Sequence, residues 1–246
     1  MSLRYLEFAG KTQPMLKNPI PGGFLIAVEG IDGTGKTSLS TLLAQWCGER
    51  GLACTISKEP TGRKWGQELR QSAKEGRLTL ERELELFALD RQQHVETSIL
   101  PALRANHIVI LDRYYWSTAA YQGARGGDPN EIMTANEVFA PKPDLVLVLD
   151  TEVDVGLHRI RARGDKPNEF EGKQALTKSR SIFLQLAGQH SNAVVIDSSD
   201  YLKQAFEAAL KTVLSRALAK MKQHEASVEA IGQLVELAEE AGIALE

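Results

Sequence analysis

One segment decides the fold of this chain: Phe24-Leu25-Ile26-Ala27-Val28-Glu29-Gly30-Ile31-Asp32-Gly33-Thr34-Gly35-Lys36-Thr37. Its first part is a continuous apolar run, which predicts a strand buried on both faces. Its second part fits the pattern G-x-x-x-x-G-K-[ST], in which glycines let backbone N–H groups turn around a phosphate. The helix expected from Lys36 points its positive dipole end at the same anion. The order of strand, loop and helix therefore predicts a site for a nucleoside triphosphate.

The side chains of this loop have separate expected tasks. Lys36 reaches the β and γ phosphates of the nucleotide, and the Thr37 hydroxyl is a ligand for Mg²⁺. Glu29 ends the strand, so it belongs either to the metal and phosphate region or to a structural hydrogen bond. The predicted nucleotide-binding residues are Gly30, Ile31, Asp32, Gly33, Thr34, Gly35, Lys36, Thr37 and Ser38.

Apolar runs like that of the first strand recur along the chain. They are Leu52–Ile56, Ile108–Leu111, Leu145–Leu149 and Ala193–Ile196. The stretches between them are long enough for helices, and apolar residues recur at helical spacing between Leu39 and Cys47. This alternation predicts a doubly wound α/β fold with a five-stranded parallel sheet.

Charged side chains stand where these strands end. The acidic ones are Glu29, Asp112, Asp150 and Asp197, and the Lys58-Glu59 pair follows the remaining strand. In open parallel sheets the ligand binds at the carboxyl ends of the strands, so we expect the site at this edge.

Composition excludes several classes of protein. The net charge of −3 argues against a globally basic protein that binds nucleic acid or a membrane surface. No apolar run approaches the roughly 18 residues needed to span a bilayer. Cys47 and Cys54 form no C-x-x-C pair, which excludes a cysteine zinc site and favours two reduced, buried thiols. Residues 1–22 lack the apolar core of a secretory signal, so we expect a cytoplasmic protein.

The length of 246 residues suits one α/β domain with an extension at each end. We expect an N-terminal extension over 1–22, the main domain over 23–221 and a helical extension over 222–246. In the last of these, Val228, Ile231, Val235 and Ala238 share one predicted helix face, which packs either on the core or on a partner chain.

The phosphate loop alone does not distinguish a switch, a transport ATPase and a kinase. The N-K-x-D motif of GTPase switches and the LSGGQ-type signature of transport ATPases are both absent. Instead, the third predicted strand ends in Asp112-Arg113, followed by Tyr114 to Gly123. A carboxylate and a guanidinium at one strand end suit Mg²⁺ and a phosphate respectively, although a helix cap with an ion pair is the alternative.

Five segments resemble the thymidylate kinase family, whose members phosphorylate dTMP to dTDP with ATP. They are Val28 to Thr37, Lys58 to Gly62, Leu86 to Arg91 running on to Leu103, Asp112 to Gly123, and Arg159 to Glu171. The fourth segment is the most specific, because D-R-Y-x-x-S-x-x-A-Y-Q-G separates this family from other nucleotide kinases. Together they cover about residues 24–220, and the terminal extensions lie outside the match.

The resemblance implies roles at an acceptor site. Asp32 accepts from the sugar 3′-OH, Phe87 lies against the thymine ring, and Arg91 and Arg113 hold the dTMP phosphate. Core packing is the alternative for Phe87 and a surface ion pair for Arg91. Ser117 and Gln122 recognise thymine by hydrogen bonds, and Tyr121 lies beside the sugar. The predicted substrate-binding residues are Asp32, Glu59, Phe87, Arg91, Arg113, Ser117, Tyr121 and Gln122, and the predicted metal-binding residues are Thr37, Asp112 and Glu29.

The resemblance also implies a mobile lid over about residues 159–171, whose arginines close on the transferring phosphoryl group. A solvated charged face is the alternative. Gly33 stands where some members carry a catalytic Arg, and Asn168-Glu169-Phe170-Glu171 lacks an Arg that the family often has. The predicted catalytic residues are Lys36, Arg113, Arg159, Arg161 and Arg163.

The family implies ATP and Mg²⁺ as cofactors, dTMP as substrate and a homodimer. From the composition we expect no nucleic-acid or membrane partner. Two other functions stay open at this point. One is a kinase of the same fold with another nucleotide or nucleoside as acceptor. The other is a non-catalytic nucleotide-binding protein, which the missing lid Arg and the two extensions would suit.

Overall fold

The computed structural model describes residues 20–164 and 172–245, and its centre is a five-stranded parallel sheet. The strands are β1 (Phe24–Glu29), β2 (Cys54–Lys58), β3 (Ile108–Asp112), β4 (Leu145–Asp150) and β5 (Ala193–Asp197). Their order across the sheet is β2-β3-β1-β4-β5, and every neighbouring pair is parallel. The predicted doubly wound α/β fold is therefore confirmed.

Helices follow each strand in the chain. They are α1 (Lys36–Glu49) after β1; α2 (Lys64–Glu75), α3 (Leu80–His94), the π-helical turn η1 (Val95–Ile99) and α4 (Leu100–Arg104) after β2; α5 (Tyr115–Gly123) and α6 (Pro129–Glu137) after β3; α7 (Val153–Ala162) and α8 (Lys173–Gln189) after β4; and α9 (Leu202–Gln223) and α10 (Val228–Glu240) after β5.

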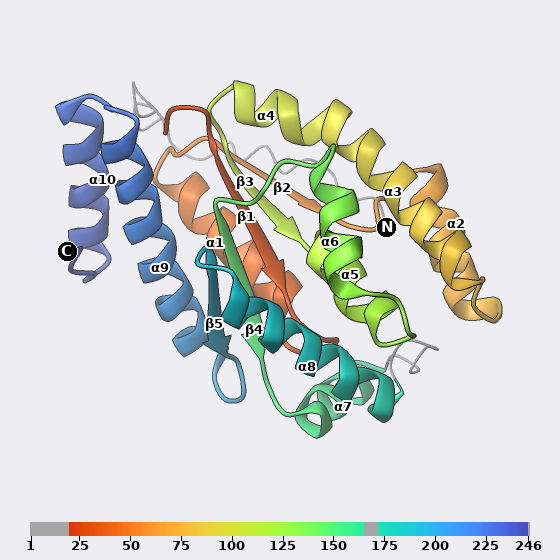
Figure 1. Ribbon diagram of the computed structural model, residues 1–246. Helices are drawn as coiled ribbons and strands as arrows, with labels where there is room; N and C mark the ends of the chain where they lie inside the picture. The colour runs from red at the N-terminus through yellow and green to blue at the C-terminus, as the bar shows by residue number, and fades with distance from the viewer. Residues whose placement is uncertain (1–19, 165–171, 246) are drawn as a thin grey trace.

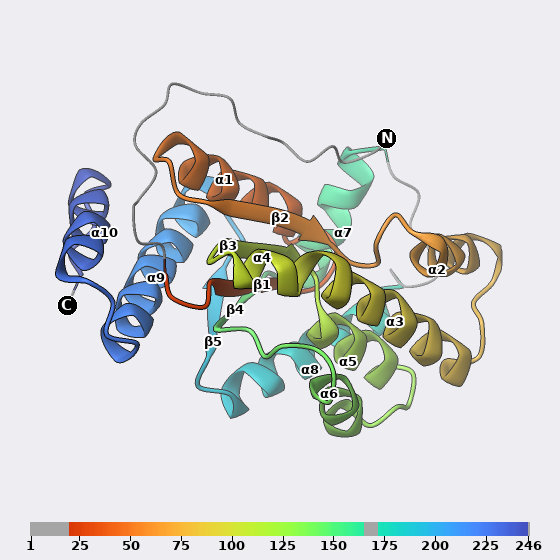
Figure 2. The ribbon, with the colours of Figure 1, turned by 90° about the horizontal axis from the view of Figure 1, so that it is seen from above.

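The sheet is covered on both faces, as Figures 1 and 2 show. Helices α1 and α9 lie on one face, with α10 outside α9, and helices α4, α5 and α8 lie on the other. Alternate residues of β1 therefore enter different cores: Ile26 and Val28 pack towards α1 and α9, whereas Leu25 and Ala27 pack towards α5 and α8. Burial on both sides explains why the central strands are apolar throughout.

Two sequence expectations need correction. The run Leu52–Ile56 was expected as the second strand, but β2 covers Cys54–Lys58. The second expectation was that all five strands are buried on both faces and that Cys54 is a buried thiol. The edge strands β2 and β5 are only partly buried, because each has a neighbouring strand on one side only, and Cys54 is half-buried.

The C-terminal extension packs on the core of its own chain. Ala230, Leu234 and Ala238 of α10 are buried in the cluster that also contains α9. Val228 does not belong to this face, since it begins the helix and is 87% exposed. Over 20–164 and 172–245, no helix is both long and apolar enough to cross a membrane.

The helices that carry the site begin at well-defined caps. The Thr79 side chain accepts a hydrogen bond from the backbone N–H of Arg82 at the start of α3. Asp128 accepts from two backbone N–H groups at the start of α6, where Pro129 needs no partner. Such caps satisfy backbone groups that a helix leaves unpaired, and they set where α3 starts relative to the sheet.

Candidate active site

The phosphate loop joins β1 to α1 at the carboxyl end of the sheet. Gly30, Gly33 and Gly35 have φ values of 132°, 85° and 92°, which residues with a Cβ rarely adopt. Helix α1 begins at Lys36, directly after Gly35. The predicted arrangement of strand, glycine loop and helix is therefore confirmed.

Gly33 also lies in close contact with α7. A Cβ built on Gly33 would approach the carbonyl oxygen of Gly156 to 2.2 Å. The loop and α7 touch through two glycines, so a larger residue cannot occupy this position without moving one of them. This contact accounts for glycine at a position where the family resemblance also allows Arg.

We expect Gly33→Ala to destabilise the fold and weaken ATP binding. The positive φ and the contact with Gly156 together should lower the free energy of unfolding by about 3 kcal/mol. Urea unfolding measures the first effect, and titration with ATP measures the second. Gly188→Ala on α8 is the control, because its added Cβ meets nothing within 4 Å. Equal stability of the two variants would contradict the close contact.

Lys36 is buried in the loop with one strong partner. Its Nζ donates to the carbonyl oxygen of Ile31 at 2.5 Å, and the residue is 6% exposed. Burial lowers its pKa to about 7, helped by the charge of Arg113 and opposed by the charge of Asp32. An anion bound beside Nζ would favour the charged form of Lys36.

Asp112 and Thr37 form the second part of the phosphate region. The Thr37 hydroxyl donates to Asp112 Oδ2 at 2.5 Å, and Lys58 Nζ lies 3.1 Å from the same oxygen. Burial alone would raise the pKa of Asp112, but the charges of Lys58 and Lys36 outweigh it and lower that pKa. Asp112 Oδ1 is buried and has no hydrogen-bond partner.

These residues fit Mg²⁺ as part of a coordination shell. An unpartnered carboxylate oxygen beside a hydroxyl supplies the hard oxygen ligands that Mg²⁺ prefers. No group of three or more His, Cys, Asp or Glu residues in the described part of the chain could hold a metal ion alone.

Glu29 is engaged by α5. Its Oε1 accepts from the backbone N–H groups of Tyr114 and Ser117 at 2.8 and 3.2 Å, and its Oε2 accepts from the Ser117 hydroxyl at 2.5 Å. The residue is fully buried. The structure therefore favours the structural hydrogen bond over the metal ligand that was also expected of Glu29.

Glu29 should make stability depend on pH. Burial raises its pKa from 4.5 to about 7, against the lowering effect of Ser117 and Arg113. The folded state then binds more protons than the unfolded state between these values, so this contribution is complete below pH 4.5 and is lost as pH rises to 7. We expect the stability of the wild type relative to Glu29→Gln to fall by about 2 kcal/mol between about pH 5 and about pH 8. Urea unfolding of both proteins at each pH checks this, and a constant difference would contradict it.

A cavity of about 170 Å³ opens beside the loop. Every residue that was predicted to bind the acceptor lines it: Asp32, Glu59, Phe87, Arg91, Arg113, Ser117, Tyr121 and Gln122. Its other lining residues are Pro60, Leu69, Arg70, Ala73, Tyr114 and Thr118. Segments far apart in the sequence thus meet in one cavity, as the carboxyl-edge rule predicts.

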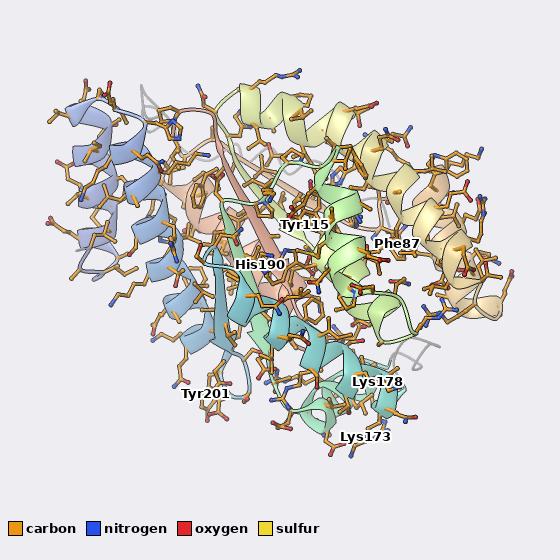
Figure 3. All side chains as sticks on the ribbon, in the orientation of Figure 1. Phe87, Tyr115, Lys173, Lys178, His190 and Tyr201 are labelled. Carbon is orange, nitrogen blue, oxygen red and sulfur yellow. The ribbon has the colours of Figure 1, made fainter. Side chains whose placement is uncertain are left out.

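Helix α3 supplies an aromatic ring and a guanidinium to this cavity. Phe87 lies on the side of α3 towards α5 (Figure 3) and is only partly buried, so it is not part of the close-packed core. Arg91 lines the cavity one turn later, but its nitrogens are bonded to Glu59, Asn136 and Thr118. It is almost fully buried, so the surface ion pair considered for Arg91 is excluded.

Arg113 organises the entrance between the loop and the cavity. Its Nη2 donates to Asp32 Oδ1 at 2.5 Å, and its Nη1 donates to Ser117 Oγ at 3.1 Å. The Tyr121 hydroxyl donates to Asp32 Oδ2 at 2.7 Å. Burial alone would raise the pKa of Asp32, but the charges of Arg113 and Lys36 hold it at about 2. Asp32 is therefore a carboxylate, able to accept from a bound hydroxyl.

Gln122 presents an unpaired acceptor. Its Nε2 donates to Glu83 Oε2 at 2.8 Å, whereas its Oε1 is buried without a hydrogen-bond partner. A buried polar atom without a partner is rare in folded proteins, and in a cavity wall it marks a place for a ligand donor.

The arginines after β4 lie at the end of α7. Arg159 donates to the carbonyl oxygens of Ser198 and Ser199 at 2.7 and 2.8 Å, which ties it to the loop after β5. Arg161 and Arg163 are exposed where α7 ends. The rest of the expected lid, including Asn168 to Glu171, lies outside the described residues.

Comparison with known proteins agrees with this geometry. The family model for thymidylate kinase matches residues 28–209. A thymidylate kinase of Xanthomonas campestris pv. campestris is 48% identical over 198 residues, which is 80% of this chain and 87% of the relative. Another from Xylella fastidiosa is 46% identical over 79% of this chain and 88% of the relative. The chain belongs to the thymidylate kinase family.

As a thymidylate kinase, the protein is a phosphotransferase that uses ATP to convert dTMP to dTDP. The family expectation drawn from its five segments is thereby confirmed, and neither a kinase with another nucleotide or nucleoside as acceptor nor a non-catalytic nucleotide-binding protein is supported.

The structure adds site residues of this thymidylate kinase that the sequence did not reveal. Leu69, Arg70 and Ala73 of α2 line the cavity, and Arg70 donates to the carbonyl oxygens of Thr61 and Pro60. Leu69 and Ala73 are one helical turn apart, so the sequence could have predicted that they share a helix face. However, α2 carries no motif of its own, and nothing in the sequence marked that face as part of the site. Conversely, Asp150 pairs with Arg180 and Asp197 accepts from the backbone of Ser199, so neither carboxylate serves the cavity.

Proposed function

We propose that ATP binds at the phosphate loop and dTMP in the 170 Å³ cavity, with the γ-phosphoryl group passing between them in line. The observation that carries this proposal is the convergence of the acceptor residues in one cavity, bounded by Asp32 of the loop. The loop and the cavity share Arg113, which contacts both.

The 5′-phosphate of dTMP is already an anion, so the transfer needs no strong general base. One of its oxygens attacks the γ-phosphorus as the bond to the bridging oxygen of ADP breaks, and the charge remains on ADP. Lys36 offers its ammonium group to the transferring oxygens, and Arg113 holds the acceptor phosphate. Asp112 and Thr37 would hold Mg²⁺ together with the nucleotide, and the ion would supply charge neutralisation at the phosphates.

The remaining cavity residues orient dTMP. Phe87 stacks on the thymine ring, and Gln122 Oε1 accepts from the thymine N3–H. Asp32 accepts from the 3′-OH, and Tyr121, bonded to Asp32, occupies the space beside the sugar where a 2′-OH would fall. We propose the arginine role of the lid for Arg161 and Arg163, because both are exposed at the end of α7, whereas Arg159 is bonded to the loop after β5.

A homodimer remains a prediction from the family, and a cytoplasmic location remains a prediction from the composition of residues 1–22. Sedimentation of the purified protein tests the first, and fractionation of the source cell tests the second.

An ADP-release assay with Mg²⁺ and ATP tests the proposal, with dTMP, dUMP, UMP, CMP, AMP, thymidine or no acceptor. We expect strong dependence on dTMP and little signal with thymidine or UMP. Turnover on another acceptor instead would support ATP binding at the phosphate loop but contradict the roles proposed for Phe87, Ser117 and Gln122. Tight ATP binding without any turnover would contradict the catalytic assignment.

A further inference from the structure

Glu83 is a fully buried acid outside the reaction described above. It lies on α3 one turn before Phe87, and it is not among the residues that line the cavity. Its carboxylate accepts from Arg77, Arg125 and Gln122, with the Gln122 Nε2 to Glu83 Oε2 distance being 2.8 Å. Two guanidinium groups and one amide thus converge on a single buried side chain.

The two arginines fix the chemical state of Glu83. Arg77 contacts both carboxylate oxygens, at 3.1 and 2.7 Å, and Arg125 Nη1 lies 2.6 Å from Oε2. A carboxylate between two cations has only acceptor sites, and it offers no proton to a neighbour.

This state determines which way the Gln122 amide faces. An amide has one donor end and one acceptor end, and only the donor end can bond a carboxylate. Turning the amide over would place its oxygen against Glu83 Oε2, which is unfavourable between two acceptors in a buried site. The Oε1 atom is therefore kept away from Glu83, and it is this atom that lacks a partner in the cavity wall.

We propose that Glu83 is the positioning residue for base selection: by fixing the Gln122 amide, it makes the site accept a pyrimidine that carries N3–H and reject cytosine. Thymine and uracil present a donor at N3, whereas N3 of cytosine is an acceptor that would face Gln122 Oε1. This inference rests on the proposed binding of the base beside Phe87 and Gln122. Rejection then arises from two acceptors left facing each other, which costs more than a missing contact.

Glu83→Gln tests the proposal, because a neutral amide at this position can bond either end of Gln122. We expect the ratio of kcat/KM for dTMP to that for dCMP to fall by about tenfold to a hundredfold. The ratio of dTMP to dUMP should stay constant, since both bases carry N3–H. Both ratios compare two acceptors on one enzyme, so a change in the folded fraction alone does not move them.

Glu85→Gln is the matched control. It makes the same change two residues along α3, where the side chain is 57% exposed and pairs with Arg82. We expect it to leave both ratios unchanged. Should Glu83→Gln fold poorly because Arg125 loses its carboxylate, the double variant Glu83→Gln, Arg125→Gln restores the charge balance and is expected to lose the same selectivity.

An unchanged ratio of dTMP to dCMP in the folded Glu83 variants, with dTMP still phosphorylated, would overturn the inference and leave the proposed function standing. A wild-type protein that phosphorylates neither dTMP nor dUMP would overturn both. A fall in the dTMP to dUMP ratio equal to that for dCMP would also overturn the inference, because it would show a general loss of the site.

Discussion

Lys36→Ala will lower kcat for dTMP phosphorylation by about a thousandfold while the fold survives. The ammonium group is the one buried cation that the phosphate loop itself carries, and burial lowers its pKa to about 7, so a bound anion would favour its charged form. Losing it removes charge stabilisation at the transferring phosphoryl group, where catalysis of this reaction mainly lies. A coupled ADP-release assay at saturating dTMP measures the loss.

The fold should tolerate this change, for a local reason. The carbonyl oxygen of Ile31, which accepts from Lys36 Nζ, also accepts from the Thr34 hydroxyl at 2.9 Å and keeps that partner in the variant. Thermal unfolding should therefore differ little from the wild type. Lys36→Met separates charge from volume, because it fills the space without the charge and should be as inactive as Lys36→Ala. Near-normal turnover in either variant would contradict the role of Lys36.

Local patterns explain why so much of this site is readable in the sequence. The phosphate loop is continuous, and its glycines are required by φ values of 85° to 132° at Gly33, Gly35 and Gly30. The apolar runs of β1, β3 and β4 follow from burial on both faces of the sheet. The acceptor residues were reached through family motifs, and the sheet topology then brings them into one cavity.

What the sequence did not reveal depends on contacts between distant residues. Glu29 and Asp112 both end central strands, yet Glu29 is bonded by the start of α5 while Asp112 keeps one oxygen unpaired. Asp150 ends a strand at the same edge, but Arg180 of α8 neutralises it. A carboxylate at a strand end therefore predicts an edge, and only its partners decide whether it serves a ligand.

The same reasoning applies to Glu83. In the sequence it is one of several acidic residues near the start of a helix, which usually indicates a solvated face. The structure buries it completely because Arg77 and Arg125, from segments on either side, supply its counter-charges. No spacing rule links these residues, so the three-dimensional packing was needed to find them.

Arg113→Ala will have the second largest effect, lowering kcat/KM for dTMP by about a thousandfold. The guanidinium donates to Asp32, Ser117 and the carbonyl oxygen of Gly30, so it joins the loop to the acceptor cavity. Removing the guanidinium takes away the paired hydrogen-bond donors for the acceptor phosphate. It also removes the charge that holds the pKa of Asp32 near 2. Arg113→Lys keeps a positive charge but loses the bidentate hydrogen-bonding geometry of the guanidinium, so it should retain only part of the activity.

The backbone of Arg113 provides the control that separates function from stability. Its φ of 73° is unusual for a residue with a Cβ, and a glycine adopts it freely. Arg113→Gly should therefore be about 1 kcal/mol more stable than Arg113→Ala in urea unfolding, while both are equally inactive. Activity that follows stability across the two variants would mean that Arg113 acts through the fold. Equal activities at unequal stabilities would place its effect in the side chain, where it contacts the loop and the acceptor.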